Sequence, residues 1–199
     1  MADNGDYEYD VFVSYRRHPP VSNWVRSYFY EQFHQWLTAA RPEAPRVFID
    51  ENDIDTGDAW PERLRRALLR SSFLVCVWTP GYFSSQWCTA ELRTMLAREQ
   101  CLALRTEEDP RGLVFPVKFN DVQYFPEYAR AIQHLDFSTW NSTAPAFYNS
   151  PAFLAFEAAT KALAETIAER LDDRPAWKPD WPVETPVISE GHGVPLPRL

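Results

Sequence analysis

Short apolar runs alternate along this chain with segments whose apolar residues recur at helical spacing. The first run, Tyr9 to Tyr15, is rich in β-branched and aromatic residues and predicts a mostly buried strand. Similar runs predict four more strands, at 46–50, 71–79, 112–119 and 133–137. Helical spacing predicts helices at 21–39, 61–70, 84–99, 125–132 and 151–171. This strand-then-helix order constrains the chain to the α/β class.

The predicted strands are continuously apolar and do not alternate apolar with polar residues. This pattern indicates a parallel sheet that is covered on both faces, with right-handed crossover connections. We therefore predict a flavodoxin-like, three-layer α/β fold around a central, mostly parallel five-stranded sheet. Pro116 cannot donate a backbone hydrogen bond, so the strand at 112–119 is expected at a sheet edge or at a bulge.

The length and composition favour one folded domain with a trailing segment. The chain has 199 residues, of which 45% are hydrophobic, enough for a single core of ordinary size. From Asp172 onward prolines are spaced through a segment without periodicity, which is typical of an extended linker. We predict a disordered N-terminus at 1–7, one domain at 8–171, and a Pro-rich tail or linker at 172–199.

Charge and residue usage exclude several function classes. A formal net charge of -8 argues against attraction to nucleic acid or anionic lipid. No apolar run approaches the roughly 18 residues of a membrane span, and the acidic N-terminus does not resemble a signal peptide, so we expect a cytoplasmic protein. The four histidines show no metal-ligand spacing, and we predict no metal site. We expect three free thiols, at Cys76, Cys88 and Cys101.

The segment 79–92 is the most informative for function. An apolar strand ends there and a helix begins, with Ser84 or Ser85 as its candidate N-cap. Trp87 and Glu91 are four residues apart, so one helical face carries an aromatic ring and a carboxylate. Open α/β sheets gather ligands at the carboxyl ends of their strands. Such a pair at this place is typical of a sugar-binding or nucleotide-binding pocket.

Three segments together resemble a known family. Residues Tyr9 to Arg17 resemble the opening box of Toll/interleukin-1 receptor (TIR) domains. The residues Val47 to Asp50, followed by Gly57, resemble the family's second strand and its BB loop. The helix at Ser84 to Leu92 resembles the one that bears the W-x-x-x-E pair of the NAD-cleaving branch. The resemblance extends from residue 8 to residue 171 and is to bacterial members.

The resemblance implies an enzyme that hydrolyses NAD+ or cyclises it, with Glu91 as the catalytic carboxylate. When neutral nicotinamide departs, it leaves an oxocarbenium-like ribose, which a fixed anion stabilises more in the transition state than in the ground state. A second carboxyl group is not needed, because the pyridinium leaves without taking a proton. The chain lacks the G-x-G-x-x-G dinucleotide fingerprint. NAD+ is therefore expected as a consumed substrate, and no cofactor is expected.

The resemblance also implies a substrate site around Glu91. Trp87 would stack on the ring or ribose of the substrate. Tyr15, Arg16 and Arg17, at the end of the first strand, would receive the pyrophosphate or the adenosine half, because the planar guanidinium of arginine suits phosphate.

Self-association belongs to the same expectation. Asp50 is placed in the substrate site, at the start of the loop that holds Ile54 and Gly57. In this family that loop packs against a neighbouring protomer, so assembly would complete the pocket. The expected partners are NAD+, other TIR protomers in a homo-oligomer or filament, and a sensor domain or partner protein. The expected role, as in microbial relatives, is stress or antiphage defence signalling.

Other interpretations remain open at the level of the sequence. Glu91 could be a solvated helix acid that pairs with Arg93 or Arg98, and Trp87 could be a core aromatic. The loop around Gly57 could be an ordinary connection. The whole chain could be a non-enzymatic adaptor that recruits other TIR domains and retains an inherited carboxylate.

Overall fold

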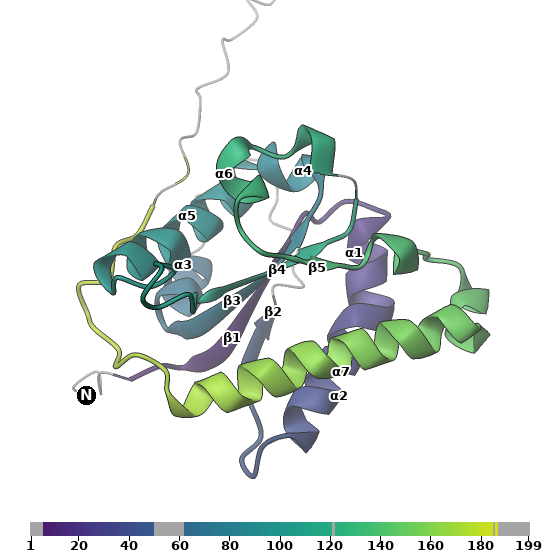
Figure 1. The fold of residues 1–199 in the computed structure, drawn as a ribbon, viewed down its shortest axis with the longest axis horizontal. Coiled ribbons are helices and arrows are strands. Elements are labelled where there is room, and N and C mark those ends of the chain that lie inside the picture. Colours follow the sequence, from purple (N-terminus) through teal and green to yellow (C-terminus); the bar gives the residue numbers. More distant parts are fainter. Residues whose placement is uncertain (1–5, 50–61, 121, 185, 187–199) are drawn as a thin grey trace, which may run out of the picture.

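A single five-stranded sheet forms the centre of the molecule (Figure 1). The computed structural model describes residues 6–49, 62–120, 122–184 and 186. Within them the strand order is β2-β1-β3-β4-β5, and every neighbouring pair is parallel. The strands are β1 (Tyr9–Tyr15), β2 (Val47–Ile49), β3 (Ser71–Trp78), β4 (Val114–Lys118) and β5 (Leu135–Asp136). The predicted α/β fold with a five-stranded parallel sheet is confirmed.

The middle strands are the most deeply buried. All eight residues of β3 are buried, and β1 is buried from Asp10 to Tyr15. The register pairs Ser14 of β1 with Cys76 of β3, and Tyr15 with Val77. Continuous burial on both faces is the reason these segments read as unbroken apolar runs.

Helices cover both faces of the sheet (Figure 1). On one face α2 and α7 lie side by side, and on the other α3 and α5 follow the sheet. The helical segments are α1 (Val21–Trp24), the π-helical η1 (Val25–Phe29), α2 (Tyr30–Ala39), α3 (Glu62–Leu69), α4 (Pro80–Phe83), α5 (Gln86–Cys101), α6 (Glu127–Arg130) and α7 (Pro151–Asp172), with 3-10 turns at Val122–Tyr124, Ser138–Trp140 and Pro145–Asn149. No helix among these is both long and apolar enough to cross a membrane, within the residues that the structure describes.

An aromatic cluster holds the α2 and α7 layer to the sheet. Trp24 is fully buried, and its ring lies 5.3 Å from that of Phe29 and 5.7 Å from that of Phe156. Its indole N–H donates to the carbonyl of Trp140 at 2.8 Å, so the polar atom of this core tryptophan is satisfied.

Caps fix the elements that follow β3. The side chain of Thr79 accepts a hydrogen bond from the backbone N–H of Tyr82, and Pro80 occupies the first turn, so the chain forms the short helix α4 directly after the strand. The side chain of Ser85 then accepts from the N–H of Cys88 and starts α5. Of the two N-cap candidates, Ser85 is the cap. The one-turn helix α4 was not predicted.

Pro116 was expected at a sheet edge or at a bulge, but its strand is not an edge strand. The strand β4 lies between β3 and β5 in the sheet. Pro116 pairs in register with Cys76 on the β3 side, whereas β5 is paired with β4 only at Val117 and Lys118. The proline therefore precedes the point where β5 begins, and its missing N–H costs the sheet little.

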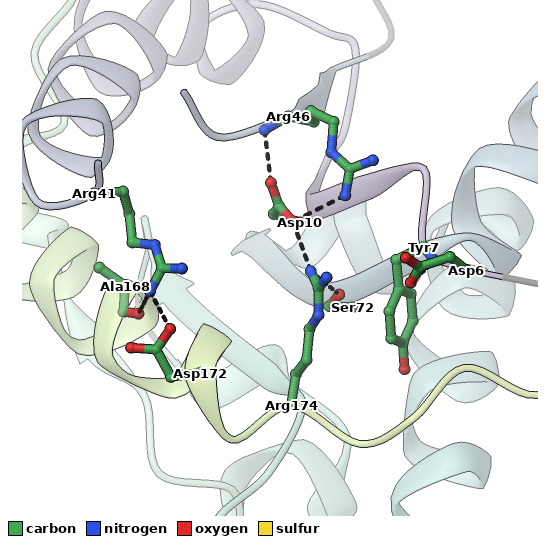
Figure 2. A network of polar contacts seen from close by, with 9 residues as sticks. All are labelled: Asp6, Tyr7, Asp10, Arg41, Arg46, Ser72, Ala168, Asp172 and Arg174. Atoms are coloured by element: carbon green, nitrogen blue, oxygen red, sulfur yellow. Dashed lines mark hydrogen bonds and ion pairs between the residues drawn. The ribbon is translucent and has the colours of Figure 1, made fainter. Parts of the chain in front are cut away.

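The residues that follow α7 lie along the amino ends of the strands, and we call residues 173–184 the C-terminal strap. Figure 2 shows Arg174 beside Asp10 at the start of β1, with the guanidinium 2.7 Å from the carboxylate and 3.5 Å from the hydroxyl of Ser72. Asp10 also accepts hydrogen bonds from the backbone and side chain of Arg46 (Figure 2). One buried carboxylate thus joins β1, the residue before β2 and the strap.

The rest of the strap covers the C-terminal half of α5. The ring of Trp181 is buried and lies 5.0 Å from the guanidinium of Arg98, which is itself fully buried. Arg98 donates to the carbonyl of Ser71 at 2.7 Å. Burial lowers the pKa of Arg98 to about 10, and the nearby Tyr7 opposes that shift. Further along, the backbone N–H of Glu184 donates to Thr94 at 3.0 Å. The division of the chain into N-terminus, domain and tail stays a prediction.

Candidate active site

The candidate site lies where the connections of the sheet change direction. The chain leaves β1 toward β2 on one side, and β3 pairs with β1 on the other. In doubly wound sheets the crevice outside the carboxyl ends of two such strands is the usual ligand site. Here those ends are Tyr15 of β1 and Trp78 of β3, and the N-terminal half of α5 packs beside them.

Glu91 is a buried acid on the first half of α5. Only 5% of the residue is exposed, and Trp87, one turn earlier, is half-buried. This burial contradicts the interpretation of Glu91 as a solvated helix acid. Arg98, one of the partners considered for it, donates instead to the carbonyls of Leu69 and Ser71 at the opposite edge of the sheet. A buried carboxylate beside the carboxyl ends of two central strands is a candidate for chemistry.

One hydroxyl group binds the Glu91 carboxylate, and a second hydroxyl group lies beside the first. Ser14 donates from its Oγ to Oε2 of Glu91 at 2.6 Å, a short bond of the kind expected between a hydroxyl and a charged acceptor. The hydroxyl of Tyr82 lies 3.0 Å from the same Ser14 Oγ. Thus β1, α4 and α5 each contribute one side chain to a buried chain of hydrogen bonds.

Sequence reasoning did not assign a role to either hydroxyl. The available signal was Ser14 itself, a polar residue near the end of an otherwise apolar strand. Nothing in the sequence marked Tyr82 as functional, because an aromatic residue after a strand is usually interpreted as part of the hydrophobic core.

Burial governs the electrostatics around Glu91. It raises the pKa of the Tyr82 phenol well above its usual value, so this hydroxyl keeps its proton at neutral pH. Burial also raises the pKa of Cys88 to about 12, and the Glu91 carboxylate adds to that shift. Arg16 and Arg17 oppose it, which places both guanidinium groups within electrostatic reach of the start of α5.

The two arginines follow β1 directly and are both half-buried. A Cβ atom added at Gly81 would lie 3.6 Å from Cγ of Arg16, so Arg16 packs beside the first turn of α4. The structure thus brings Arg16, Arg17, Trp87 and Glu91 to the same edge of the sheet, and their roles in a substrate site stay predictions.

Tyr15 is placed differently. Successive side chains of a strand point to opposite faces, so Tyr15 lies across the sheet from Ser14. Its hydroxyl accepts a hydrogen bond of 3.4 Å from Nε of Arg26 on η1. The assignment of Tyr15 to the substrate site stays a prediction.

Three of the residues assigned from the sequence lie outside the described part of the chain. These are Asp50, Ile54 and Gly57. Among the described residues no group of three or more histidine, cysteine, aspartate or glutamate side chains could hold a metal ion. The chemistry that the described side chains offer is therefore that of a fixed carboxylate, an aromatic ring one helical turn away and two guanidinium groups.

Comparison with known proteins identifies the family. Residues 11–149 match the family model of the TIR domain, which is more than half of the chain. Similar solved structures include the TIR domain of the Toll-related receptor TRR-2 from Hydra magnipapillata, with 18% identity, a TM-score of 0.47, and coverage of 76% of this chain and 98% of that one. Another is the set of TIR domains in the activated Roq1 resistosome that recognises the pathogen effector XopQ, with 22% identity, a TM-score of 0.40, and coverage of 81% and 84%. The family predicted from the sequence motifs is confirmed, and this chain belongs to the TIR domain family.

Proposed function

We propose that this TIR domain is an NAD+ nucleosidase that cleaves the bond between nicotinamide and ribose. One observation carries the proposal. The carboxylate of Glu91 is buried, is held by Ser14 at 2.6 Å, and lies at the carboxyl ends of β1 and β3 one helical turn after Trp87. Desolvating and fixing an acid costs folding free energy, and sites of catalysis are where such costs are commonly found.

The reaction suits a single carboxylate. The C–N bond breaks with both electrons going to the pyridinium ring, so nicotinamide leaves neutral and positive charge develops on the ribose. A fixed anion beside the ribose stabilises this charge as it forms. Water then attacks the anomeric carbon and releases a proton to solvent to give ADP-ribose, or a nucleophile within the adenosine half attacks to give a cyclic isomer. Trp87 would stack on the substrate and hold the ribose against Glu91.

The two guanidinium groups would bind the anionic half of the substrate. Arg16 and Arg17 are half-buried beside the start of α5, where they act electrostatically on Cys88. A dinucleotide whose ribose lies at Glu91 would bring its pyrophosphate within reach of such groups. Self-association through the loop that contains Ile54 and Gly57, with Asp50 at its start, would complete the pocket, and the proposed role is stress or antiphage defence signalling.

The test is release of nicotinamide by the purified full chain. NAD+ is incubated with protein at increasing concentration and the products are separated by mass spectrometry, for the parent and for Glu91→Gln. We expect release that rises faster than protein concentration, and a loss of at least about 100-fold in Glu91→Gln. Glu165→Gln on α7, an exposed acid near Lys161, is the matched control and should retain the parent rate.

The proposal is overturned by either of two outcomes. One is the absence of nicotinamide release by the parent even at the concentration where it assembles, as measured by light scattering. The other is equal release by the parent and Glu91→Gln. Both would favour the adaptor interpretation, in which the domain only recruits other TIR domains.

A further inference from the structure

Glu91 does not stand alone, because its orientation depends on the hydroxyl groups beside it. Ser14 is 2% exposed, and Tyr82 is fully buried. The distances are 2.6 Å from Ser14 Oγ to Glu91 Oε2 and 3.0 Å from Ser14 Oγ to the Tyr82 hydroxyl. These three side chains come from β1, α4 and α5, which the backbone fixes relative to one another.

The number of protons that each group can donate sets the direction of these hydrogen bonds. An ionised carboxylate only accepts hydrogen bonds, so the single hydroxyl proton of Ser14 is committed to Glu91. The bond between Ser14 and Tyr82 must then use the proton of the tyrosine. Burial raises the pKa of Tyr82 well above its usual value, so that proton is always present in the working range of pH. The order is Tyr82 to Ser14 to Glu91.

Each hydroxyl is itself held in place. Tyr82 is part of the capped turn of α4, where its backbone N–H donates to the Thr79 side chain at 3.0 Å. Its ring packs at 5.4 Å against that of Phe83. Ser14 lies within β1, where it pairs in register with Cys76. The backbone of each residue is thus fixed, and the hydrogen bond from Ser14 favours one orientation of the Glu91 carboxylate.

We propose that Ser14 is a positioning residue for the Glu91 carboxylate, and that Tyr82 orients the Ser14 hydroxyl. The inference rests on the proposed function, since it assigns the two hydroxyls to the nucleosidase reaction. Ser14 fixes one carboxylate oxygen and thereby the plane of the whole group, which sets the angle at which negative charge meets the ribose. A catalytic group held in this way loses little entropy when the substrate binds.

The experiment compares Ser14→Ala, Tyr82→Phe and the double variant in the full chain. Removing a hydrogen bond to a charged group should lower kcat for nicotinamide release by about 10- to 100-fold in Ser14→Ala. Tyr82→Phe, which acts only through Ser14, should lower kcat by about 3- to 10-fold, since it removes a hydrogen bond between neutral groups. KM should stay within about twofold of the parent in both, because neither hydroxyl is expected to contact substrate.

The double variant separates positioning from general structural damage. If Tyr82 acts through Ser14, the double variant loses no more activity than Ser14→Ala alone. Losses that multiply, or a Ser14→Ala variant with the parent kcat, overturn the inference. Should Ser14→Ala fail to fold, Tyr82→Phe alone decides, and a parent-like kcat in it is the contrary result. Ser71→Ala is the matched control, because this buried strand serine donates to Ala67 at the opposite edge of the sheet and should keep the parent kcat.

A readout independent of activity keeps this inference separate from the proposed function. Crystal structures of the parent and of Ser14→Ala should show the Glu91 carboxylate rotated in the variant. If the parent releases no nicotinamide, the proposed function fails, and the crystal structures alone decide whether Ser14 positions Glu91. An unchanged carboxylate in Ser14→Ala overturns the positioning role whatever the activity.

Discussion

The two halves of α5 each bury a glutamate, but they satisfy it in opposite ways. Glu99, in the C-terminal half, accepts two hydrogen bonds from the guanidinium of Arg105, at 2.8 and 3.0 Å. It also accepts from the backbone N–H groups of Leu113 and Val114. Its negative charge is matched by a positive one and its oxygens are saturated by donors. This is the arrangement of a carboxylate that holds structure together.

Glu91, in the N-terminal half, accepts a hydrogen bond from a neutral group. Its Oε2 accepts from the hydroxyl of Ser14, which is in turn next to the hydroxyl of Tyr82. A hydroxyl group orients a carboxylate without neutralising it. The comparison teaches that burial alone does not mark a functional acid. The two differ in their described donors: a guanidinium and two backbone N–H groups hold Glu99, whereas a serine hydroxyl orients Glu91.

The largest effect on stability should come from replacing Glu99, and replacing Glu91 should have a much smaller one. Glu99→Ala leaves the charge of Arg105 without its partner and two buried backbone N–H groups without an acceptor. We expect a loss of about 3–5 kcal/mol in the free energy of unfolding. Glu91→Gln should change it by only about 1 kcal/mol or less, because the amide oxygen still accepts from Ser14.

Chemical denaturation measures both variants, and nicotinamide release is assayed on the same samples well below their unfolding midpoints. We expect Glu99→Ala to lose stability and keep activity, and Glu91→Gln to lose activity and keep stability. If both acids affect the same property, the distinction between the two halves of α5 is wrong.

A smaller effect is expected from crowding the Glu99 site through Gly112. A Cβ atom at this position would lie 2.6 Å from the Glu99 carboxylate and 2.0 Å from Nη2 of Arg105. Gly112→Ala must therefore push the ion pair apart, at a cost of roughly 1–3 kcal/mol. Urea denaturation with a common slope would measure it.

Gly81, on α4 beside Arg16, offers the matched control near the Glu91 site. A Cβ atom there meets Arg16 and Thr79 only at 3.6 Å, which is ordinary contact. Gly81→Ala should leave the free energy of unfolding unchanged or raise it by about 0.5 kcal/mol, through lower entropy of the unfolded chain. Equal destabilisation by both alanines would show that the close approach at Gly112 is not the cause.

The smallest effect leaves stability untouched and concerns the cysteines near the two ends of α5. Cys88 is buried with a pKa of about 12, whereas Cys101 is exposed. At pH 8 the Cys88 thiol therefore keeps its proton, and its thiolate fraction rises as the pH rises toward 12. Cys76 is also buried, and burial raises its pKa well above the usual value.

Iodoacetamide at pH 8 should therefore place one label, on Cys101, in the native protein and three in denaturant, as read by peptide mass spectrometry. Labelling of Cys88 at the rate of Cys101 in the native protein would mean that the N-terminal half of α5 opens readily. In that case its burial of Glu91 could not be rigid.

The elements of the fold could be predicted because each one is encoded locally. The apolar run at 71–79 becomes β3 (Ser71–Trp78), and the predicted helix at 151–171 becomes α7 (Pro151–Asp172). Hydrophobic periodicity and the Ser85 cap suffice for such assignments. The short α4 escaped prediction because Pro80 and Gly81 read as a break, while the capping of Thr79 makes them a turn of helix.

The site could be predicted only in part, because its contacts are distant in sequence. Trp87 and Glu91 share one helix face and were found by their spacing. The bond from Ser14 to Glu91 joins residues 77 positions apart, which no local pattern reveals. The strap was read as a linker from its proline spacing, although its two tryptophans, Trp177 and Trp181, were a sign of packing that composition alone did not bring out.

The strap also determines where this domain can be cut for experiments. A chain ended at Asp172 would keep every strand and helix that the structure describes. It would lose Trp181, whose ring covers Arg98, and Arg174, whose guanidinium binds Asp10. Water would then reach the guanidinium of Arg98, which is fully buried in the intact protein. Arg98 lies on α5, the helix that also carries Glu91. The match to the family model ends at residue 149. A protein expressed only to that residue would therefore lack α7 and the C-terminal strap that packs on α5.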